Sequence, residues 1–299
     1  MSRKATPFPY KGFKSNLQHR AVARALASWR DKSEKGLKEA SDSANWSVAK
    51  TSMLQNAACP ISEFDVAILA LVYRVDNQTR AAVYHGAQRA RDPQAYDRLP
   101  GAEECVGWTY GDVAAEASHI RIVATDAFPH VVRTAGYTDA LQKYYSDNTA
   151  LRQCHQYSGA AHDHITRNLF QQASLNLHLV ISEALLRCVV GSAPVVVDQL
   201  VWLMELAHRP NIEIQVVPNS AGRLAAASSF SIMTFREDRF DDVIYIENPH
   251  GATWLEIEEV REPYAIIFDR IAEGALSTED TLEQIAEAVQ ALQATIAET

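Results

Sequence analysis

The chain of 299 residues is 47% hydrophobic and 22% charged, which is the composition of a globular protein and excludes an intrinsically disordered one. No apolar run approaches the roughly 20 residues of a membrane span, and the basic N-terminus lacks the apolar segment of a secretory signal. The four cysteines are far apart and form no CxxC motif. We therefore expect a soluble cytoplasmic protein with reduced cysteines and about two domains.

Charge is distributed unevenly along the chain. Residues 1–92 contain 15 Lys and Arg against 8 Asp and Glu, a formal charge of +7, whereas residues 93–299 contain 13 against 29, a charge of −16. A basic segment joined to an acidic one indicates two modules with different partners, and polyanion binding is the expected use of the basic module. Ordinary variation in surface charge is the alternative explanation.

The first part of the chain predicts a flexible basic arm over residues 1–16 and an all-helical domain over residues 17–92. Helical periodicity and capping residues predict helices over residues 17–32, 37–44, 47–56, from 62 onward, and 77–91. Asn45 tolerates the left-handed conformation of a tight turn, and Ser47 is a good N-cap for the third helix. The dipeptide Asp92–Pro93 indicates a domain boundary.

The remainder, residues 93–299, mixes strands and helices without a regular βαβ alternation, which predicts an α+β domain. Short alternating or β-rich runs predict strands over residues 117–124, 175–182, 212–217, 230–235 and 243–247. Amphipathic patterns predict helices over residues 194–207, 257–273 and 278–296. The expected fold class is therefore α+β, with an all-α helix-turn-helix domain followed by a larger mixed domain.

The segment between Leu37 and Val75 fits a helix-turn-helix, because a short helix, a turn residue and a capped second helix occur in a basic, all-helical domain. Its informative positions are Leu37, Glu39, Trp46, Ser47, Lys50, Ser52, Leu54, Ser62, Asp65, Val66, Leu69, Tyr73 and Val75. At these positions the chain resembles the lambda-repressor-like (Xre-type) regulators of actinobacteria that carry a C-terminal domain of unknown function. The resemblance continues in TDAFPHVVRTAGYTDAL, in the segment from LVISEALL to IEIQVVP, and in SFSIMTF and DVIYIE.

This resemblance implies that the helix over residues 47–56 enters the major groove, with the side chains near its N-terminus facing base edges. The DNA-contacting residues that it implies on this chain are Ser47, Val48, Ala49, Lys50, Ser52 and Met53. The arm residues Arg3, Lys4, Lys11 and Lys14, together with Lys50, are expected to contact phosphates or the minor groove.

The chain departs from the family pattern within the same helix. Met53 stands where Arg is usual, and Gln55 stands where Glu is usual. Val48, Ala49 and Met53 cannot form bidentate hydrogen bonds with guanine or adenine and could contact only thymine methyl groups. Two hypotheses therefore stay open: a regulator that reads DNA sequence, and a partner-binding protein whose helix-turn-helix has lost sequence-specific readout.

Five residues of the larger domain are candidate ligand contacts. Glu183 and Arg187 are four positions apart at a strand-to-helix junction, where they hold either a polar ligand or each other. Arg133 and Tyr137 lie in a segment expected to border a pocket, although Tyr137 also fits a core aromatic with a hydrogen-bonded hydroxyl. Glu247 shares one face of its strand with Tyr245.

An enzyme is the least favoured reading. Cys154, His155, His162 and His164 are close in sequence, but no carboxylate with metal-ligand spacing accompanies them, so surface histidines are expected. The chain has no GxGxxG, P-loop, GxSxG, HExxH or paired-carboxylate motif. We therefore predict no catalytic activity, no cofactor and no metal.

The sequence thus predicts a cytoplasmic transcriptional regulator that binds double-stranded DNA as a homodimer. Its acidic domain is expected to sense either a small-molecule effector or a small protein partner and to change DNA affinity by linkage. No membrane association is expected.

Overall fold

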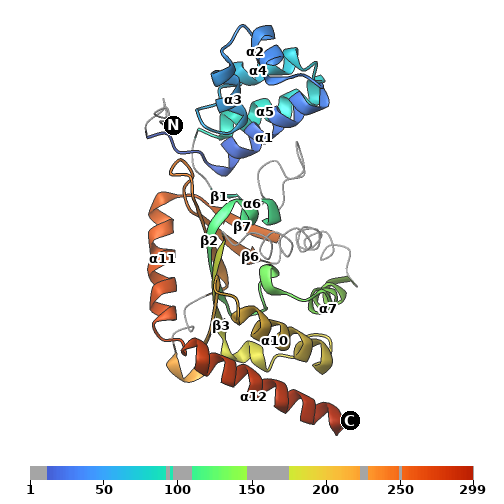
Figure 1. Ribbon diagram of the computed structural model, residues 1–299, viewed down its shortest axis with the longest axis vertical. Coiled ribbons are helices and arrows are strands. Elements are labelled where there is room, and N and C mark those ends of the chain that lie inside the picture. The colour runs from blue at the N-terminus through green and yellow to red at the C-terminus, as the bar shows by residue number, and fades with distance from the viewer. Residues whose placement is uncertain are drawn as a thin grey trace, which may run out of the picture. The chain divides into compact units, whose positions relative to one another are not determined.

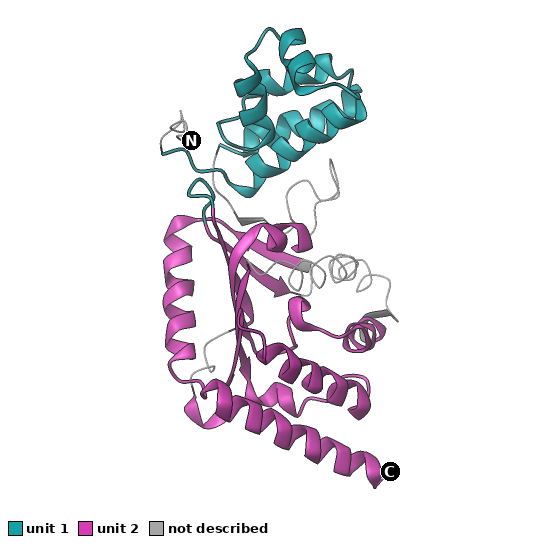
Figure 2. Ribbon diagram, viewed as in Figure 1, with its two compact units in different colours: residues 1–94, 99–108, 237–241 teal, residues 95–98, 109–236, 242–299 magenta. Residues whose placement is uncertain are grey.

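The computed structural model describes residues 12–91, 95–96, 110–146, 175–222, 228–248 and 251–298. The chain divides into two compact units (Figure 2). The first unit comprises residues 1–94, 99–108 and 237–241, and the second comprises residues 95–98, 109–236 and 242–299. The arm residues Arg3, Lys4 and Lys11, and the cluster of Cys154, His155, His162 and His164, lie outside the described residues.

The first unit is a bundle of short helices (Figure 1). Its helices are α1 (Leu17–Lys32), α2 (Leu37–Ser43), α3 (Val48–Gln55), α4 (Glu63–Val72) and α5 (Asn77–Arg89). Leu26, Leu54 and Leu69 are fully buried at the centre of its apolar core. The five predicted helices are confirmed, with boundaries that differ by one or two residues.

Local sequence signals determine where the helices of the bundle begin. Asn45 adopts a φ of 56°, so the chain turns sharply between α2 and α3 in the left-handed conformation that Asn tolerates. The Ser47 hydroxyl accepts a hydrogen bond from the Lys50 backbone N–H and caps α3, as predicted. Ser62 and Asp65 form a reciprocal capping box at the start of α4.

A segment distant in sequence completes the first unit. Residues 237–241 connect two strands of the second unit, yet they belong to the helical unit. The Ser15 backbone N–H donates to the Arg239 carbonyl over 2.6 Å, and Lys14 forms an ion pair of 3.3 Å with Asp241. The Arg20 guanidinium lies 4.4 Å from the centroid of the Phe240 ring, which packs against the apolar core.

The second unit contains a mixed sheet in the order β1-β7-β6-β5-β2-β3-β4. The strands are β1 (Ala95–Tyr96), β2 (Ala117–Ala124), β3 (Asn176–Ser182), β4 (Ile212–Val217), β5 (Phe230–Phe235), β6 (Val243–Asn248) and β7 (Gly251–Leu255). Strands β2, β3 and β4 are parallel, whereas β5, β6, β7 and β1 pair in antiparallel fashion. Strand β2 therefore lies where the sheet changes from parallel to antiparallel pairing.

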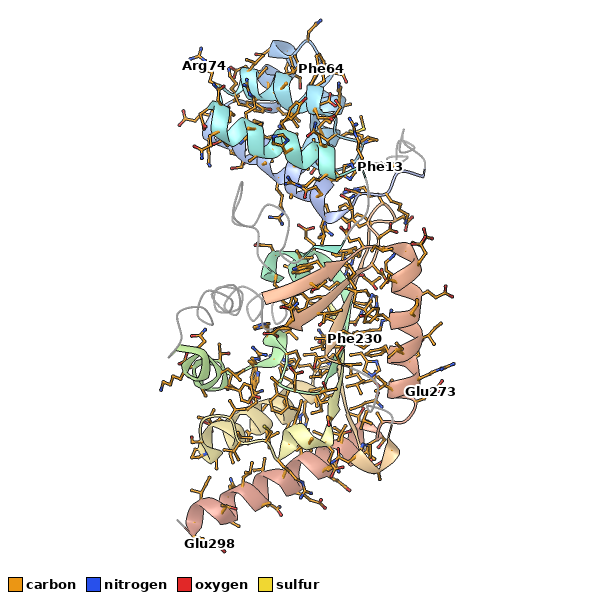
Figure 3. All side chains as sticks on the ribbon, turned by 180° about the vertical axis from the view of Figure 1, so that it is seen from behind. Phe13, Phe64, Arg74, Phe230, Glu273 and Glu298 are labelled. Atoms are coloured by element: carbon orange, nitrogen blue, oxygen red, sulfur yellow. The ribbon has the colours of Figure 1, made fainter. Side chains whose placement is uncertain are left out.

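Helices cover both faces of the sheet (Figure 1). They are α6 (Tyr110–Glu116), α7 (Ala135–Ser146), α10 (Ala193–Ala207), α11 (Glu258–Ala272) and α12 (Thr278–Ala297), with short 3-10 turns over His130–Val132, Glu183–Leu186 and Asn219–Ala221. Helix α11 lies on one face, where Phe268 and Ile271 pack on Val123 and Val180. Figure 3 shows Phe230 between the sheet and α11, where its ring meets Tyr264 edge-on. Helices α7 and α10 lie on the other face.

The α+β fold class is confirmed. The five strands predicted from alternation and β-rich composition are present, as are the three helices predicted near the C-terminal end. Strands β1 and β7 and helices α6 and α7 are also present and are not among the elements that the sequence predicts. None of the helices within the described ranges has the length and apolar character that crossing a membrane requires.

The capping box predicts a measurable cost for Ser62→Ala. This change removes the hydroxyl that accepts from the Asp65 backbone N–H, so the helical unit should lose about 1 kcal/mol of unfolding free energy. Urea denaturation of the full chain, followed by hydrogen exchange of the α4 amides, measures the loss. Ser43→Ala, which removes an exposed hydroxyl bonded inside α2, should change stability by less than about 0.5 kcal/mol.

Candidate functional site

The solvent-facing side of α3 carries the six residues predicted to contact DNA. Ser47, Val48 and Ala49 are exposed, with Val48 at 42% of its full area, and the side chains of Lys50, Ser52 and Met53 are half-buried. The opposite side of the helix is buried. The α3 surface, which we define as these six residues, is therefore the part of the helix available to a partner.

Buried hydrogen bonds fix the orientation of α3. The Ser41 hydroxyl of α2 donates to the Thr51 hydroxyl over 2.9 Å. The Gln55 side chain accepts from Arg30 of α1 over 2.8 Å and donates to the Tyr73 hydroxyl over 2.9 Å. Gln55 thus ties α3 to two other segments of the bundle. These bonds keep the same side of α3 turned to solvent.

Lys50 is partly exposed and also forms contacts within the helical bundle. Its Nζ lies 2.8 Å from Asp65 Oδ1 and 3.9 Å from the centroid of the Trp46 ring. Burial alone would raise the pKa of Asp65, but hydrogen bonds from Lys50 and Ser62 outweigh it and lower that pKa. The lysine charge is therefore partly neutralised before any phosphate approaches.

Other basic side chains near α2 and α3 differ in how many partners already hold them. Lys14, predicted as a phosphate contact, donates to the Asp238 carbonyl over 2.6 Å and pairs with Asp241. Lys35 pairs with Glu39. Lys38 is exposed on α2 and forms no ion pair with any described residue. Lys38 is not among the residues that the sequence predicts to contact DNA, although its place in the first turn of α2 could have indicated it.

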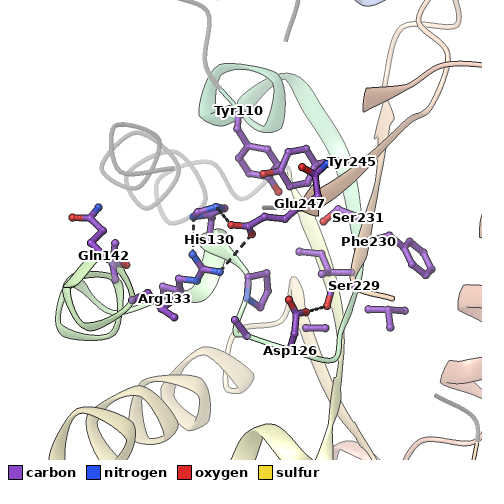
Figure 4. A pocket seen from close by; sticks show the side chains of 18 residues that line it. Tyr110, Asp126, His130, Arg133, Gln142, Ser229, Phe230, Ser231, Tyr245 and Glu247 are labelled. Atoms are coloured by element: carbon purple, nitrogen blue, oxygen red, sulfur yellow. Dashed lines mark hydrogen bonds and ion pairs between the residues drawn. The ribbon is translucent and has the colours of Figure 1, made fainter. Parts of the chain in front are cut away.

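A cavity of about 210 Å³ in the second unit brings together further polar side chains (Figure 4). It lies at the carboxyl end of β2, where open sheets commonly bind ligands. The described part of its polar lining comes from α6, the turn over His130–Val132 and its flanks, helix α7, and strands β5 and β6. Among the described residues, the titratable ones that line it are Tyr110, Asp126, His130, Arg133, Tyr245 and Glu247.

Arg133, His130 and Glu247 form a polar cluster at the inner end of this cavity. Arg133 Nη1 lies 3.2 Å from His130 Nδ1, and its Nη2 lies 3.5 Å from Glu247 Oε2. His130 Nε2 lies 3.3 Å from Glu247 Oε1. Because arginine can only donate, His130 Nδ1 is the acceptor in its contact with Arg133.

Two tyrosines border the cluster. The Tyr110 and Tyr245 rings have centroids 4.6 Å apart, and Trp254 packs against both. Burial, together with the nearby Glu247 carboxylate, raises the pKa of both tyrosines well above the usual value, so both hydroxyls stay protonated. Tyr245 and Glu247 both line the cavity, which agrees with the prediction that they share one face of their strand.

Gln199 positions Arg133. It is fully buried on α10, where its Nε2 donates to the Val132 carbonyl over 2.8 Å. Its Oε1 accepts from the Thr134 backbone N–H over 2.7 Å. One carboxamide therefore holds the backbone on both sides of Arg133, whose Nε in turn donates to the Phe128 carbonyl. The sequence reading missed Gln199, although a glutamine within the apolar stripe of an amphipathic helix is a signal for such a role.

The structure brings together only two of the five predicted ligand contacts. Arg133 and Glu247 meet in the cavity, whereas Tyr137 lies in the adjacent core with its ring edge on Phe128. Glu183 and Arg187 are 4.0 Å apart in a different hollow beside α12. Glu183 also accepts from the Asn219 backbone N–H over 2.9 Å and so links the segments that follow β3 and β4. Tyr110 and His130 were missed because no local pattern relates them to Glu247.

Within the described ranges, no group of three or more His, Cys, Asp or Glu residues is arranged to hold a metal ion. Comparison with protein families matches residues 109–287 to the family described as a domain of unknown function, DUF5753. The match covers more than half of the chain and includes the cavity and Gln199. No curated protein and no solved structure matches the chain.

Lys50→Ala should weaken the helical unit. The lowered pKa of Asp65 stabilises the fold above the unfolded value of about 3.9, and this contribution disappears as the pH falls through the lower folded value. Loss of Lys50 should cost roughly 1 kcal/mol at neutral pH, because the pair is only partly buried, and should reduce the acid dependence.

Urea denaturation of the full chain between about pH 3 and 7 measures this effect. Burial of His19 lowers its pKa to about 4, which also weakens the bundle as the pH falls below about 6.5, so the variant and the wild type are compared at each pH. Lys38→Ala is the matched control and should leave stability unchanged. Equal losses from both substitutions would contradict a structural role for Lys50.

Gln199→Leu should be strongly destabilising. It leaves the Val132 carbonyl and the Thr134 N–H without their partner, and the expected loss is about 2–3 kcal/mol. Asp198→Ala, at the adjacent exposed position on α10, should change stability by less than about 0.5 kcal/mol. Denaturation of both variants, followed by hydrogen exchange of residues 130–138, measures the difference. An unchanged free energy of unfolding in Gln199→Leu would rule out a stabilising role for the two hydrogen bonds of Gln199.

Proposed function

The chain belongs to the DUF5753 family, and on that premise we propose that it is a DNA-binding transcriptional regulator. In this proposal the helical unit is an Xre-type helix-turn-helix that binds double-stranded DNA. The second unit senses an effector and changes DNA affinity by linkage, which requires that the effector bind differently to the free and DNA-bound states.

The observation that carries this proposal is the α3 surface. Helix α3 follows a left-handed turn, is capped by Ser47, and keeps one side in solvent through buried bonds on the other. A recognition helix requires this arrangement, because its first turn must present side chains and N–H groups to the major groove. The charge of +7 on residues 1–92 supplies the electrostatic attraction that DNA binding needs.

A homodimer is part of the proposal. Phe64 and Leu71 are seven positions apart on α4, which places them on the same side of that helix, and each is 67% exposed. Exposed apolar side chains of this size are typical of contact surfaces. A second copy packed on this stripe would give two recognition helices, whose half-sites would be spaced by about 34–36 Å or a multiple of it.

The chemistry of the same α3 surface supports a second candidate function. Val48 and Ala49 have no polar side-chain atoms, and Lys50 is bonded to Asp65. A helix with this surface could bind phosphates without distinguishing bases, in which case the protein would act through a protein partner rather than at a defined operator. Selection of DNA fragments by the full chain at physiological salt separates the two: one enriched sequence supports the regulator, and even retention supports the alternative.

We expect Val48→Glu to abolish DNA binding, because it places a carboxylate on the exposed α3 surface without disturbing the core. Gln78→Glu adds the same charge at an exposed position in the first turn of α5 and is the matched control. It should weaken binding by no more than about threefold. Fluorescence anisotropy with the enriched fragment measures both affinities, and similar losses in the two variants would contradict the proposed placement of α3.

Lys38→Ala tests the phosphate contact separately. It should weaken binding to all sequences alike and reduce the slope of log K against log salt by about one. The measurement is a salt titration of the wild type and the variant on the same fragment. A change in sequence preference with an unchanged slope would place Lys38 at a base instead of a phosphate.

A further inference from the structure

We propose that Val48 reads the C5-methyl group of thymine in the major groove, so that the protein recognises where thymine methyl groups lie rather than a pattern of hydrogen-bonding groups. This inference rests on the proposed function and deepens it, because it names the feature of the DNA that the α3 surface distinguishes.

Three of the six side chains on the α3 surface already have partners within the helical unit. Met53 is half-buried and packs against the apolar core. The Lys50 Nζ lies 2.8 Å from Asp65 Oδ1. The Ser47 hydroxyl accepts from the Lys50 backbone N–H over 3.1 Å and caps the helix. These three side chains are therefore held by the fold and are poorly placed to follow a base edge.

The other three side chains of the surface are those of Val48, Ala49 and Ser52. Val48 and Ala49 are the first two residues of α3, in the turn of a recognition helix that meets base edges. Val48 is 42% exposed, and Ala49 is exposed as well. Ser52 follows Val48 by four positions and lies beside it on the same side of the helix. A base within reach of the first turn therefore meets the isopropyl group of Val48.

An isopropyl group distinguishes bases by what it can contact. Only thymine carries a methyl group in the major groove, whereas guanine and adenine present hydrogen-bonding groups there and cytosine presents an amino group. Packing Val48 on the methyl group removes apolar surface from water and is favourable. Packing it on an amino or carbonyl group removes that group from water without a hydrogen bond, which costs free energy. Val48 therefore favours thymine over the other three bases.

Ser52 adds affinity without making this choice. A hydroxyl both donates and accepts, so it bonds to purines and pyrimidines alike. The Ser52 oxygen lies 3.4 Å from Asn56 Nδ2, an arrangement that leaves its proton free to rotate toward a base. The selection of a base consequently falls to Val48.

Charge and size favour DNA over a protein as the occupant of this surface. Residues 1–92 carry a formal charge of +7, which attracts a polyanion. A protein interface buries about 800 Å² on each partner around an apolar centre. In α3, whose residues are all described, the exposed apolar side chains are Val48 and Ala49, which are two small groups beside the hydroxyl of Ser47.

Replacement of thymine by uracil tests the inference, because uracil lacks the methyl group and keeps the same hydrogen-bonding groups. The probe is the DNA fragment enriched by the full chain, with uracil placed at one thymine at a time. Uracil at the position read by Val48 should weaken binding about fourfold, and uracil elsewhere by less than about 1.5-fold. Fluorescence anisotropy measures each affinity. Sequence-specific binding that no uracil substitution weakens would overturn the inference.

The methylated base 5-methylcytosine separates the methyl group from the rest of thymine. At the uracil-sensitive position, a pair of cytosine with guanine should bind at least about fourfold more weakly than thymine with adenine. A pair of 5-methylcytosine with guanine returns the methyl group to the same place and should regain most of this affinity. Equal affinities for the cytosine and 5-methylcytosine fragments would reject recognition of the methyl group.

The variant Val48→Ala assigns the contact to its side chain. Alanine suits an exposed helical position better than valine, so the variant should fold, and thermal unfolding of the free protein checks this. It should bind the thymine and uracil fragments with affinities within about 1.5-fold of each other. Ser52→Ala is the matched control and should weaken both fragments by the same factor. An unchanged ratio in Val48→Ala would show that another residue contacts the methyl group.

The outcomes separate this inference from the proposed function. Sequence-specific binding on which uracil has no effect would leave the regulator and remove methyl recognition. Binding without sequence preference would remove both, and it would support the alternative in which α3 contacts phosphates alone. An enriched fragment with one uracil-sensitive position, whose sensitivity disappears in Val48→Ala, is the result that the inference requires.

Discussion

The carboxamide of Gln199 fixes the position of the backbone around Arg133, and the arrangement of the cavity depends on that position. By pairing with the backbone on either side of Arg133, it places this residue against Glu247 and His130, which come from a strand and a turn far apart in the sequence. A buried glutamine whose carboxamide oxygen and nitrogen are both hydrogen-bonded specifies one position of the bonded backbone segment. An apolar residue does not, because only the glutamine leaves polar groups unpaired when that segment shifts. The apolar residues around Gln199 provide stability, whereas its two hydrogen bonds determine the position of the backbone around Arg133 relative to α10.

In the helical unit, the main constraint is that the short helix α3 is held in place while one of its sides stays exposed to solvent. Eight residues of α3 could not form a stable helix alone. They are held by the Ser47 cap, by the buried Leu54, and by the bonds of Thr51 and Gln55. Lys50 contacts Asp65 and Trp46 within the bundle, and its positive charge is consequently less available to an external anion than its place on the surface suggests.

Much of the fold was predictable because the determining signals are local. The caps at Ser47 and Ser62, the turn at Asn45, and the alternating or β-rich runs of β2 to β6 are each local signals of about ten residues or fewer. Strand β7 contains few alternating positions, and its identity comes from pairing with β6. The short α6 likewise packs on β2, and α7 packs on α10, so both depend on contacts with elements that are distant in the sequence.

The site was less predictable than the fold for the same reason. Arg133 and Glu247 were identified as candidates separately, but the sequence gives no reason to pair them with each other rather than with Glu183 or Arg187. Their proximity follows from β6 lying two strands away from β2 in the sheet. Tyr110 and His130 also line the cavity because of the tertiary arrangement of the second unit, which periodicity and motif spacing do not encode.

The membership of residues 237–241 in the helical unit has a consequence for synthesis. Most domains that precede another along a chain can fold while the later part is still being made. Here Phe240, which packs against the apolar core of the bundle, and Asp241, which pairs with Lys14, are synthesised long after α5. The bundle can therefore acquire its complete set of contacts only after four-fifths of the chain has left the ribosome, and a fragment that stops after α5 would expose the surface that Phe240 covers.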